Sequence, residues 1–196
     1  MKQLSIILSL FCLISNEAQN NMKEELPYKE IPEIKVEYSA GSVLARMIDG
    51  LGFRFYWATE GLRVEDLNFK PSEEARTTSE TIDHIYGLSK VIYNSAINKP
   101  NGNTNKDEDL SFEEKRKRIL IMLQESANIF RNSEDLNKHS IVFKRDDKTS
   151  EYPMWNQING PIADALWHCG QVVSFRRASG NPYNSKASLF TGKLRE

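Results

Sequence analysis

Residues 156–182, NQINGPIADALWHCGQVVSFRRASGNP, decide the fold, because they predict one long helix with a clear start and a clear stop. Asn159 is a suitable N-cap, and Pro161 is tolerated in the first turn, where backbone N–H groups have no partner within the helix. Gly180 can adopt the left-handed conformation that ends a helix, and Pro182 prevents the helix from continuing. We therefore expect a helix of about six turns in this stretch.

A polar stripe runs along one face of this predicted helix. Asp164, His168 and Gln171 recur at spacings of four and three residues, so their side chains point the same way. Asp164 and His168 are one turn apart, close enough to hold a single ion, as two histidines do in an HExxH helix. The pair needs a third ligand from elsewhere in the chain, and His84 is the candidate.

Three other segments have the apolar periodicity of amphipathic helices. They span about residues 40–60, 79–96 and 111–132. Capping-box patterns, Thr77 with Glu80 and Ser111 with Glu114, mark the start of the last two. On the second of these helices, His84 is expected to point toward the core or toward a cavity in it. Four amphipathic helices without a sustained strand pattern predict an all-α fold, a four-helix bundle with long connections.

The segments outside these helices predict little regular structure. HSIVFK (139–144) has the composition of a short strand, but no partner strand is apparent, so we interpret 133–152 as a long connection. His139 lies in this polar connection and is expected to be solvated. Residues 183–196 are expected to form a surface coil in which Leu189 and Phe190 dock on the bundle.

The first residues have the pattern of a signal peptide. Lys2 is followed by an apolar run, Leu4 to Ile14, which is too short to span a bilayer. We therefore expect residues 1–18 to be removed on export to the periplasm or the extracellular space, with no stable membrane insertion afterwards. A buried N-terminal helix is the alternative. Residues 19–38 are expected to be an extended lead-in to the bundle domain, residues 39–182.

Length and composition fit an ordinary soluble domain. The chain has 196 residues, of which 39% are hydrophobic and 27% are charged. A net charge of −1 gives no electrostatic reason to expect nucleic acid or an anionic membrane surface as a partner. The processed chain would keep one cysteine, Cys169, which we expect to be small buried apolar filler. Because bundle interfaces use similar apolar stripes, a homodimer is also open.

Two motifs carry a resemblance to a known family. KPSEEARTTSETIDHI (70–85) and DALWHCGQVVSFRRASGNP (164–182) resemble segments of the DinB/YfiT-like superfamily, up-down-down-up four-helix bundles that include metal-dependent enzymes. The second motif is similar to the family's H-x-x-H-H-x-G-Q segment. By position, the resemblance implies that His84, Asp164 and His168 are metal ligands. Asp164 stands where the family usually has histidine, and Trp167 stands where it often has another.

Each candidate residue also has a structural interpretation. His84 can be a core histidine, and Asp164 can form a salt bridge to an arginine; Arg46, Arg54 and Arg176 are the available partners. Gln171 can orient a ligand or contact substrate, or it can make an interhelical hydrogen bond. Glu80 can act as a base on metal-bound water, although completing the capping box is its simpler role.

The pattern therefore supports three hypotheses. The first is an exported metalloenzyme of the hydrolase type, in which zinc, nickel, iron(II) or manganese activates water for a small-molecule substrate. The second is a non-enzymatic protein that binds a metal or a small ligand. The third is a structural bundle in which the polar cluster is an internal salt bridge.

Overall fold

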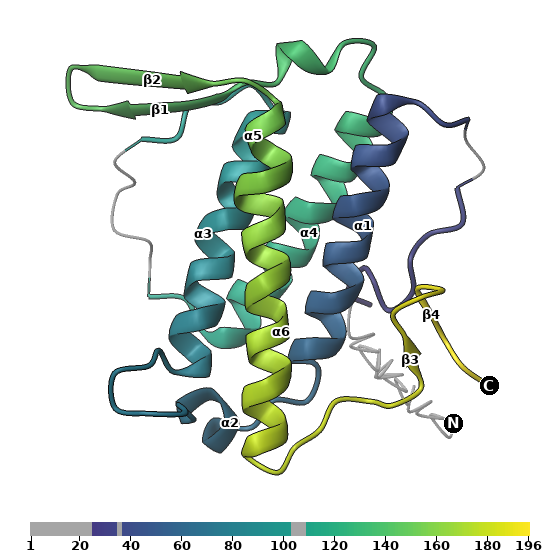
Figure 1. Cartoon of the computed structure of the whole chain (residues 1–196), viewed down its shortest axis with the longest axis vertical. Coiled ribbons are helices and arrows are strands. Elements are labelled where there is room, and N and C mark those ends of the chain that lie inside the picture. The colour runs from purple at the N-terminus through teal and green to yellow at the C-terminus, as the bar shows by residue number, and fades with distance from the viewer. Residues whose placement is uncertain (1–24, 35–36, 103–108) are drawn as a thin grey trace, which may run out of the picture.

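The computed structural model describes residues 25–34, 37–102 and 109–196 (Figure 1). The predicted signal peptide, residues 1–18, and the first part of the predicted lead-in lie outside the described residues. Four long helices pack side by side. They are α1 (Ala40–Thr59), α3 (Thr78–Ala96), α4 (Phe112–Arg131) and α6 (Ala163–Ala178). The predicted helical bundle is confirmed at this level.

The helices form two pairs that run in opposite directions (Figure 1). Arg116 at the start of α4 donates from Nε to the hydroxyl of Thr59 at the end of α1, over 2.9 Å, so these two helices are antiparallel. Lys115 lies 2.6 Å from the carboxylate of Asp83 near the start of α3, so α3 and α4 are parallel. α6 ends beside the end of α1, and these two helices are also parallel. A helix pair that runs in parallel needs a long return connection, which agrees with the length of the α3–α4 segment.

Capping boxes start three of the long helices, as the sequence indicates for two of them. Thr77 and Glu80 cap α3, Ser111 and Glu114 cap α4, and Ser39 caps α1 with the N3 serine. Apolar side chains on the inner faces then fill the core. Its largest fully buried members include Phe53, Phe55, Ile85, Leu123 and Phe130. Burying each such side chain stabilises the fold by about 1.5–3 kcal/mol. Among the described residues, no helix is both long enough and apolar enough to cross a membrane.

The fourth predicted helix is irregular at its start, which differs from the expectation. A short helix α5 (Trp155–Gln157) leads into a π-helical turn η2 (Ile158–Ile162) and then into α6. Asn159 therefore lies inside this helical path and is not its N-cap. The break is at Gly160, where φ −93° and ψ −111° are not helical, next to Pro161, which has no N–H to donate. The predicted end is confirmed, because Gly180 adopts the left-handed conformation with φ +82°.

The long connection predicted for residues 133–152 contains a strand at HSIVFK and also the partner strand that is not apparent from the sequence. A short 3₁₀ turn, η1 (Leu136–Lys138), precedes two antiparallel strands, β1 (Ile141–Arg145) and β2 (Lys148–Tyr152). A two-residue turn joins them, with Asp146 at φ +50°, as expected for a tight hairpin. The partner strand escaped notice because all five residues of β2 are exposed and show no apolar alternation.

His139 was expected to be solvated, and this is wrong. Its side chain is buried, with Nε2 2.9 Å from the hydroxyl of Ser133. Its ring packs edge-on against Phe130, with 5.2 Å between the ring centroids. His139 is therefore a hydrogen-bonded core residue, which is the structural role that a single histidine often has.

Both ends of the described chain pack on the outside of α1. The tail forms a second small hairpin, β3 (Ala187–Ser188) with β4 (Lys193–Leu194), instead of the expected coil. Ala187 is buried, whereas Leu189 and Phe190, the residues expected to dock, are exposed. The lead-in contacts this tail, since the N–H of Ile31 donates to the carbonyl of Gly192 over 2.8 Å.

A buried ion pair holds the lead-in against the bundle. The hydroxyl of Tyr28 donates to Asp49 on α1 over 3.1 Å, and Arg131 on α4 donates to the other oxygen of Asp49 over 2.6 Å. Burial raises the pKa of Tyr28 and that of Asp49, and in Asp49 the cation of Arg131 opposes this change. The short helix α2 (Val64–Asn68) closes the opposite end of the bundle from the β1–β2 hairpin (Figure 1).

Candidate metal centre

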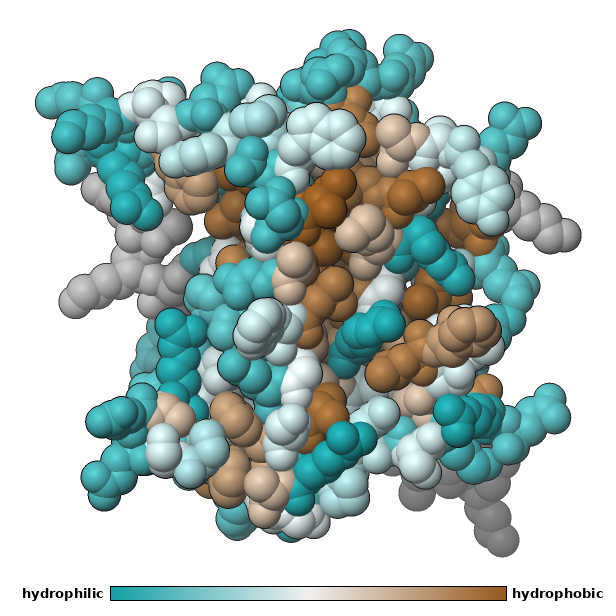
Figure 2. Space-filling model, in the orientation of Figure 1, coloured by the Kyte–Doolittle hydropathy of each residue, from teal (hydrophilic) through white to brown (hydrophobic). Residues whose placement is uncertain are grey.

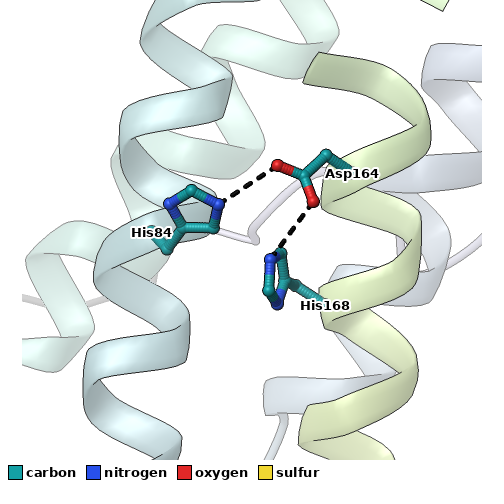
Figure 3. Close-up of side chains that lie close together, drawn as sticks. All are labelled: His84, Asp164 and His168. Atoms are coloured by element: carbon teal, nitrogen blue, oxygen red, sulfur yellow. Dashed lines mark hydrogen bonds and ion pairs between the residues drawn. The ribbon is translucent and has the colours of Figure 1, made fainter. Parts of the chain in front are cut away.

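His84 lies on α3, less than two turns after the capping box that starts this helix. Its side chain points across to α6 and is 34% exposed (Figure 3). Of the two expected positions, the core and a cavity in it, neither fully describes His84, because the side chain lies half-buried between the two helices with an open side to solvent. An imidazole in this position can contact both solvent and a group on the neighbouring helix.

Asp164 and His168 lie one turn apart near the start of α6 and face His84 (Figure 3). The Oδ2 atom of Asp164 is 3.1 Å from Nε2 of His84, and its Oδ1 atom is 3.2 Å from Nε2 of His168. The two imidazole rings approach edge-to-face, with 4.6 Å between their centroids. One ligand atom from each residue lies within 4.8 Å of the others, so the structure brings all three predicted residues to a common point.

The three side chains differ in how far they reach solvent. His168 is 13% exposed and Asp164 is 45% exposed. The cluster therefore has a sheltered side at His168 and an open side at Asp164. A cation held here would be bound from one side by protein and would keep coordination positions that water or a small molecule can reach.

Gln171 fixes the orientation of His168. Its Oε1 atom is 2.7 Å from Nδ1 of His168, and a carbonyl oxygen only accepts hydrogen bonds. Nδ1 therefore donates this hydrogen bond, and Nε2 is the ring nitrogen that faces Asp164. An unprotonated nitrogen and a carboxylate oxygen, 3.2 Å apart, repel each other unless a cation lies between them or a proton joins them.

Glu80 is not part of this cluster. Its Oε2 atom accepts hydrogen bonds from the N–H of Thr77 over 2.7 Å and from the Thr77 hydroxyl over 3.1 Å. These hydrogen bonds lower the pKa of the Glu80 carboxyl, with the one from the backbone N–H as the largest cause. The capping role weighed for Glu80 is thus the one that the structure shows.

None of the three arginines considered as partners of Asp164 contacts it. Each donates instead to a backbone carbonyl: Arg46 to Pro32 over 3.4 Å, Arg54 to Gly50 over 3.0 Å and Arg176 to Trp57 over 3.1 Å. Within the described residues, the partners of the Asp164 carboxylate are the two imidazoles. The arginine salt bridge is therefore excluded as the explanation of Asp164 in this structure.

Two other residues of the second motif, Trp167 and Cys169, take no part in the cluster. Trp167 is 73% exposed on the outer side of α6. Cys169 is buried on the core side, as expected, and burial raises the pKa of its thiol to about 12. Cys169 does not belong to the group of ligand atoms that converge at the cluster, and its thiol stays protonated at neutral pH.

The sequence was compared with models of protein families and with curated proteins. No family model matches the chain, and no curated protein matches it. The DinB-like resemblance therefore depends on the two motifs alone, and the chemistry of this site is argued from its own geometry.

Proposed function

We propose that this protein is an exported, DinB-like bundle whose His84, Asp164 and His168 hold one divalent cation, and that it is a metal-dependent hydrolase. The observation that carries the proposal is the convergence of two imidazole nitrogens on the two oxygens of one carboxylate, at 3.1 and 3.2 Å. Two neutral imidazoles and one anionic carboxylate are a donor set that zinc, iron(II), nickel and manganese accept.

Three protein ligands with open coordination positions are typical of a catalytic metal site. Three protein ligands leave at least one position for water, and the 45% exposure of Asp164 leaves that position open to a substrate. When bound, a divalent cation would supply a water molecule of lowered pKa and a Lewis acid for a substrate oxygen. Gln171 would hold the ring of His168 with its Nε2 lone pair directed at the site, and His84 would approach from α3.

Two further observations support the DinB-like assignment. The first ligand lies on the second long helix and the other two on the fourth, as the resemblance implies for this family. The long helices also run in two parallel pairs, α1 with α6 and α3 with α4, which is the order of an up-down-down-up bundle. Export is the proposal that follows from the apolar run near Lys2.

A non-enzymatic metal-binding protein is the second candidate. The observation that favours it is the position of Glu80, the carboxylate considered as a general base, which caps α3 instead of facing the cluster. Among the described residues, the group of metal-ligating side chains contains only Asp164 as a carboxylate, and Asp164 would itself be a ligand. Water activation would then depend on the cation without help from a second acid or base.

Metal analysis of the purified protein tests the proposal. We expect about one equivalent of divalent metal by elemental analysis after dialysis, and loss of this metal in His84→Ala, Asp164→Asn and His168→Ala. Asp83→Asn is the matched control, because Asp83 is the neighbour of His84 on α3 but pairs with Lys115 on α4. Stoichiometric metal that survives the two histidine substitutions would overturn the assignment.

Activity separates the two candidate functions. The metal-loaded protein is assayed on a panel of esters, amides and phosphoesters, next to the His168→Ala variant. Turnover that requires both the metal and His168 supports the hydrolase. Metal binding without turnover on the whole panel supports the non-enzymatic alternative, and an absence of bound metal at micromolar supply supports the internal salt bridge of the third hypothesis.

A further inference from the structure

A groove lies beside α5 and the π-helical turn η2, on the side away from the metal centre. It has a volume of about 680 Å³ and separates the start of α1 from α5 and the following π-helical turn. Val43 and Met47 on α1 line one wall, and Trp155 and Ile158 line the other. Figure 2 shows apolar surface gathered in this part of the molecule, where α5 and the start of α1 lie in Figure 1.

The groove is open, and several of its apolar side chains reach solvent. Trp155 is 76% exposed and Val43 is 50% exposed. An apolar surface that is concave, continuous and accessible favours a ligand with apolar parts, and the volume is within the range of small-molecule sites. His84, Asp164 and His168 do not line it, so the groove is separate from the candidate metal centre.

A second cavity of about 770 Å³ continues the groove along α1. The two share Tyr38, Val43 and Met47 as wall residues, so they lie next to each other along the outside of the bundle, and we call the two together the channel. In the second cavity Asp49 is neutralised by Arg131, over 2.6 Å. Arg46 lines the same cavity, is exposed, and forms no salt bridge among the described residues, although its positive charge also acts on Asp49 and opposes the rise in the pKa of that carboxyl.

Charge divides the channel into two different ends. At the end with Arg46, the other lining charges are paired, Asp49 with Arg131 and Glu33 with Lys193. At the far end, the lining residues Glu134 and Asp135 are acidic. A long apolar ligand with one negative head group would therefore be held in one direction, with its head at Arg46 and its tail toward Trp155.

We propose that this channel binds a straight-chain fatty acid. The carboxylate pairs with Arg46, and the acyl chain lies along Val43 and Met47 and reaches the rim at Trp155. Burial of the chain supplies the affinity, and the guanidinium supplies the preference for an acid over a neutral lipid. The proposal does not depend on the metal centre, because the two sites share no residue.

Binding of dodecanoate and of dodecan-1-ol to the full chain tests this proposal. Tryptophan fluorescence is the readout, because Trp155 is at the rim of the groove. We expect Arg46→Gln to weaken dodecanoate binding by about tenfold and to leave dodecan-1-ol binding within about twofold, since only the acid uses the charge. Arg76→Gln, an exposed arginine outside the channel, is the matched control and should change neither.

A second variant tests the wall of the groove. Val43 is half exposed, so Val43→Asp should fold, and an unchanged circular dichroism spectrum and a cooperative urea unfolding transition check this. We expect it to weaken both ligands by at least about tenfold, because a carboxylate in the wall opposes the acyl chain.

Three results would overturn the proposal. One is the failure of the wild-type protein to bind either ligand, and another is an equal loss of both ligands in Arg46→Gln. The third is self-association of the wild-type protein that Val43→Asp abolishes, with no ligand binding, because a second copy of the chain would then cover the groove.

Discussion

His84, Asp164 and His168 can bind one cation together only if the unprotonated nitrogen of His168 faces the other two residues. Gln171 lies one turn after His168 on α6, and its Oε1 atom is 2.7 Å from Nδ1 of that histidine. This hydrogen bond is worth testing because polar contacts behind a ligand orient it and tune its basicity. Of the roles that the sequence suggests for Gln171, orienting a ligand is the one that a contact in the structure supports.

We predict that Gln171→Ala weakens metal binding by about 10- to 100-fold. The reason is that the ring of His168 loses the acceptor that fixes its tautomer. Competition with a chromophoric chelator measures the affinity, and Gln171→Glu, which keeps an accepting oxygen, should restore most of it. Ser174→Ala, on the next turn of α6, is the control; an affinity that Gln171→Ala leaves unchanged would reduce Gln171 to a structural residue.

Asp66 on α2 is a buried carboxylate, and its ionisation makes the stability of the fold depend on pH. It is fully buried and accepts hydrogen bonds from Arg63, from the hydroxyl of Ser179 over 2.6 Å and from Asn181 over 2.6 Å. The side-chain hydrogen bonds from Arg63 are the main reason that its pKa is far below the usual range.

Asp66→Asn should therefore destabilise the protein by about 2–4 kcal/mol at pH 7. A carboxyl whose pKa is lowered by folding stabilises the fold above its unfolded pKa of about 4, and this stability is lost as the pH falls toward the folded pKa. The difference between the variant and the wild type should thus shrink from about pH 5 to about pH 2, because over roughly this range Asp66 becomes protonated in the unfolded chain while it stays ionised in the folded protein. Urea unfolding at both ends of this range measures it, with Glu65→Gln, an exposed neighbour, as the control.

The sequence could predict residues whose role depends on local spacing, but not those whose partners are far along the chain. Asp164 and His168 follow from helical periodicity. Arg176 does not, because its guanidinium is buried and donates to the carbonyls of Trp57, Ala58 and Glu60 at the end of α1. No pattern around Arg176 indicates that two helices end side by side there.

At the scale of the helices, close approach between backbones sets the geometry of the bundle. Gly41 near the start of α1 faces the end of α4, and a Cβ atom at this position would lie 2.4 Å from the carbonyl oxygen of Phe130. Gly87 on α3 has nothing within 4 Å of the corresponding position. Both glycines lie within helices, but packing requires a glycine only at Gly41 and not at Gly87.

Gly41→Ala should destabilise the protein by about 1–3 kcal/mol, since the backbones of α1 and α4 must separate. Gly87→Ala should stabilise it by about 0.5–1 kcal/mol, because alanine restricts the unfolded chain and favours helix. Denaturant unfolding of both variants gives the two free energies of unfolding. Equal effects of the same sign would show that α1 and α4 are not in close contact at Gly41.

The helices of the bundle could be predicted from the sequence, while the connections could not. Apolar periodicity and capping boxes locate α1, α3 and α4 within a few residues of their bounds. The β1–β2 hairpin has no such signal, because a strand that is exposed on both faces needs no alternation of apolar residues. The π-helical turn before α6 was missed for another reason: Pro161 is compatible with both a regular first turn and an irregular one.

At the scale of the whole molecule, the candidate metal centre joins two helices that are far apart in the chain. His84 and Asp164 are 80 positions apart, and α3 and α6 meet as one of the long-helix interfaces of the bundle. A ligand that binds only when both helices are in place stabilises the folded state relative to the unfolded state.

We predict that metal raises the melting temperature by about 5–10 °C at a free concentration one hundred times the dissociation constant, which corresponds to about 2.7 kcal/mol. Thermal unfolding with zinc, nickel and manganese in turn also ranks these ions. His84→Ala should lose the increase and Asp83→Asn should keep it. An increase that His84→Ala retains would place the metal elsewhere in the molecule.

The position of Cys169 has a practical consequence for work on this domain. Within the described residues it is the one free cysteine, and it is buried on the core-facing side of α6. A maleimide or a spin label would therefore not attach to the native bundle at this residue. One engineered cysteine at a chosen surface position, in a chain that lacks Cys12, would give a singly labelled protein without removing any core side chain.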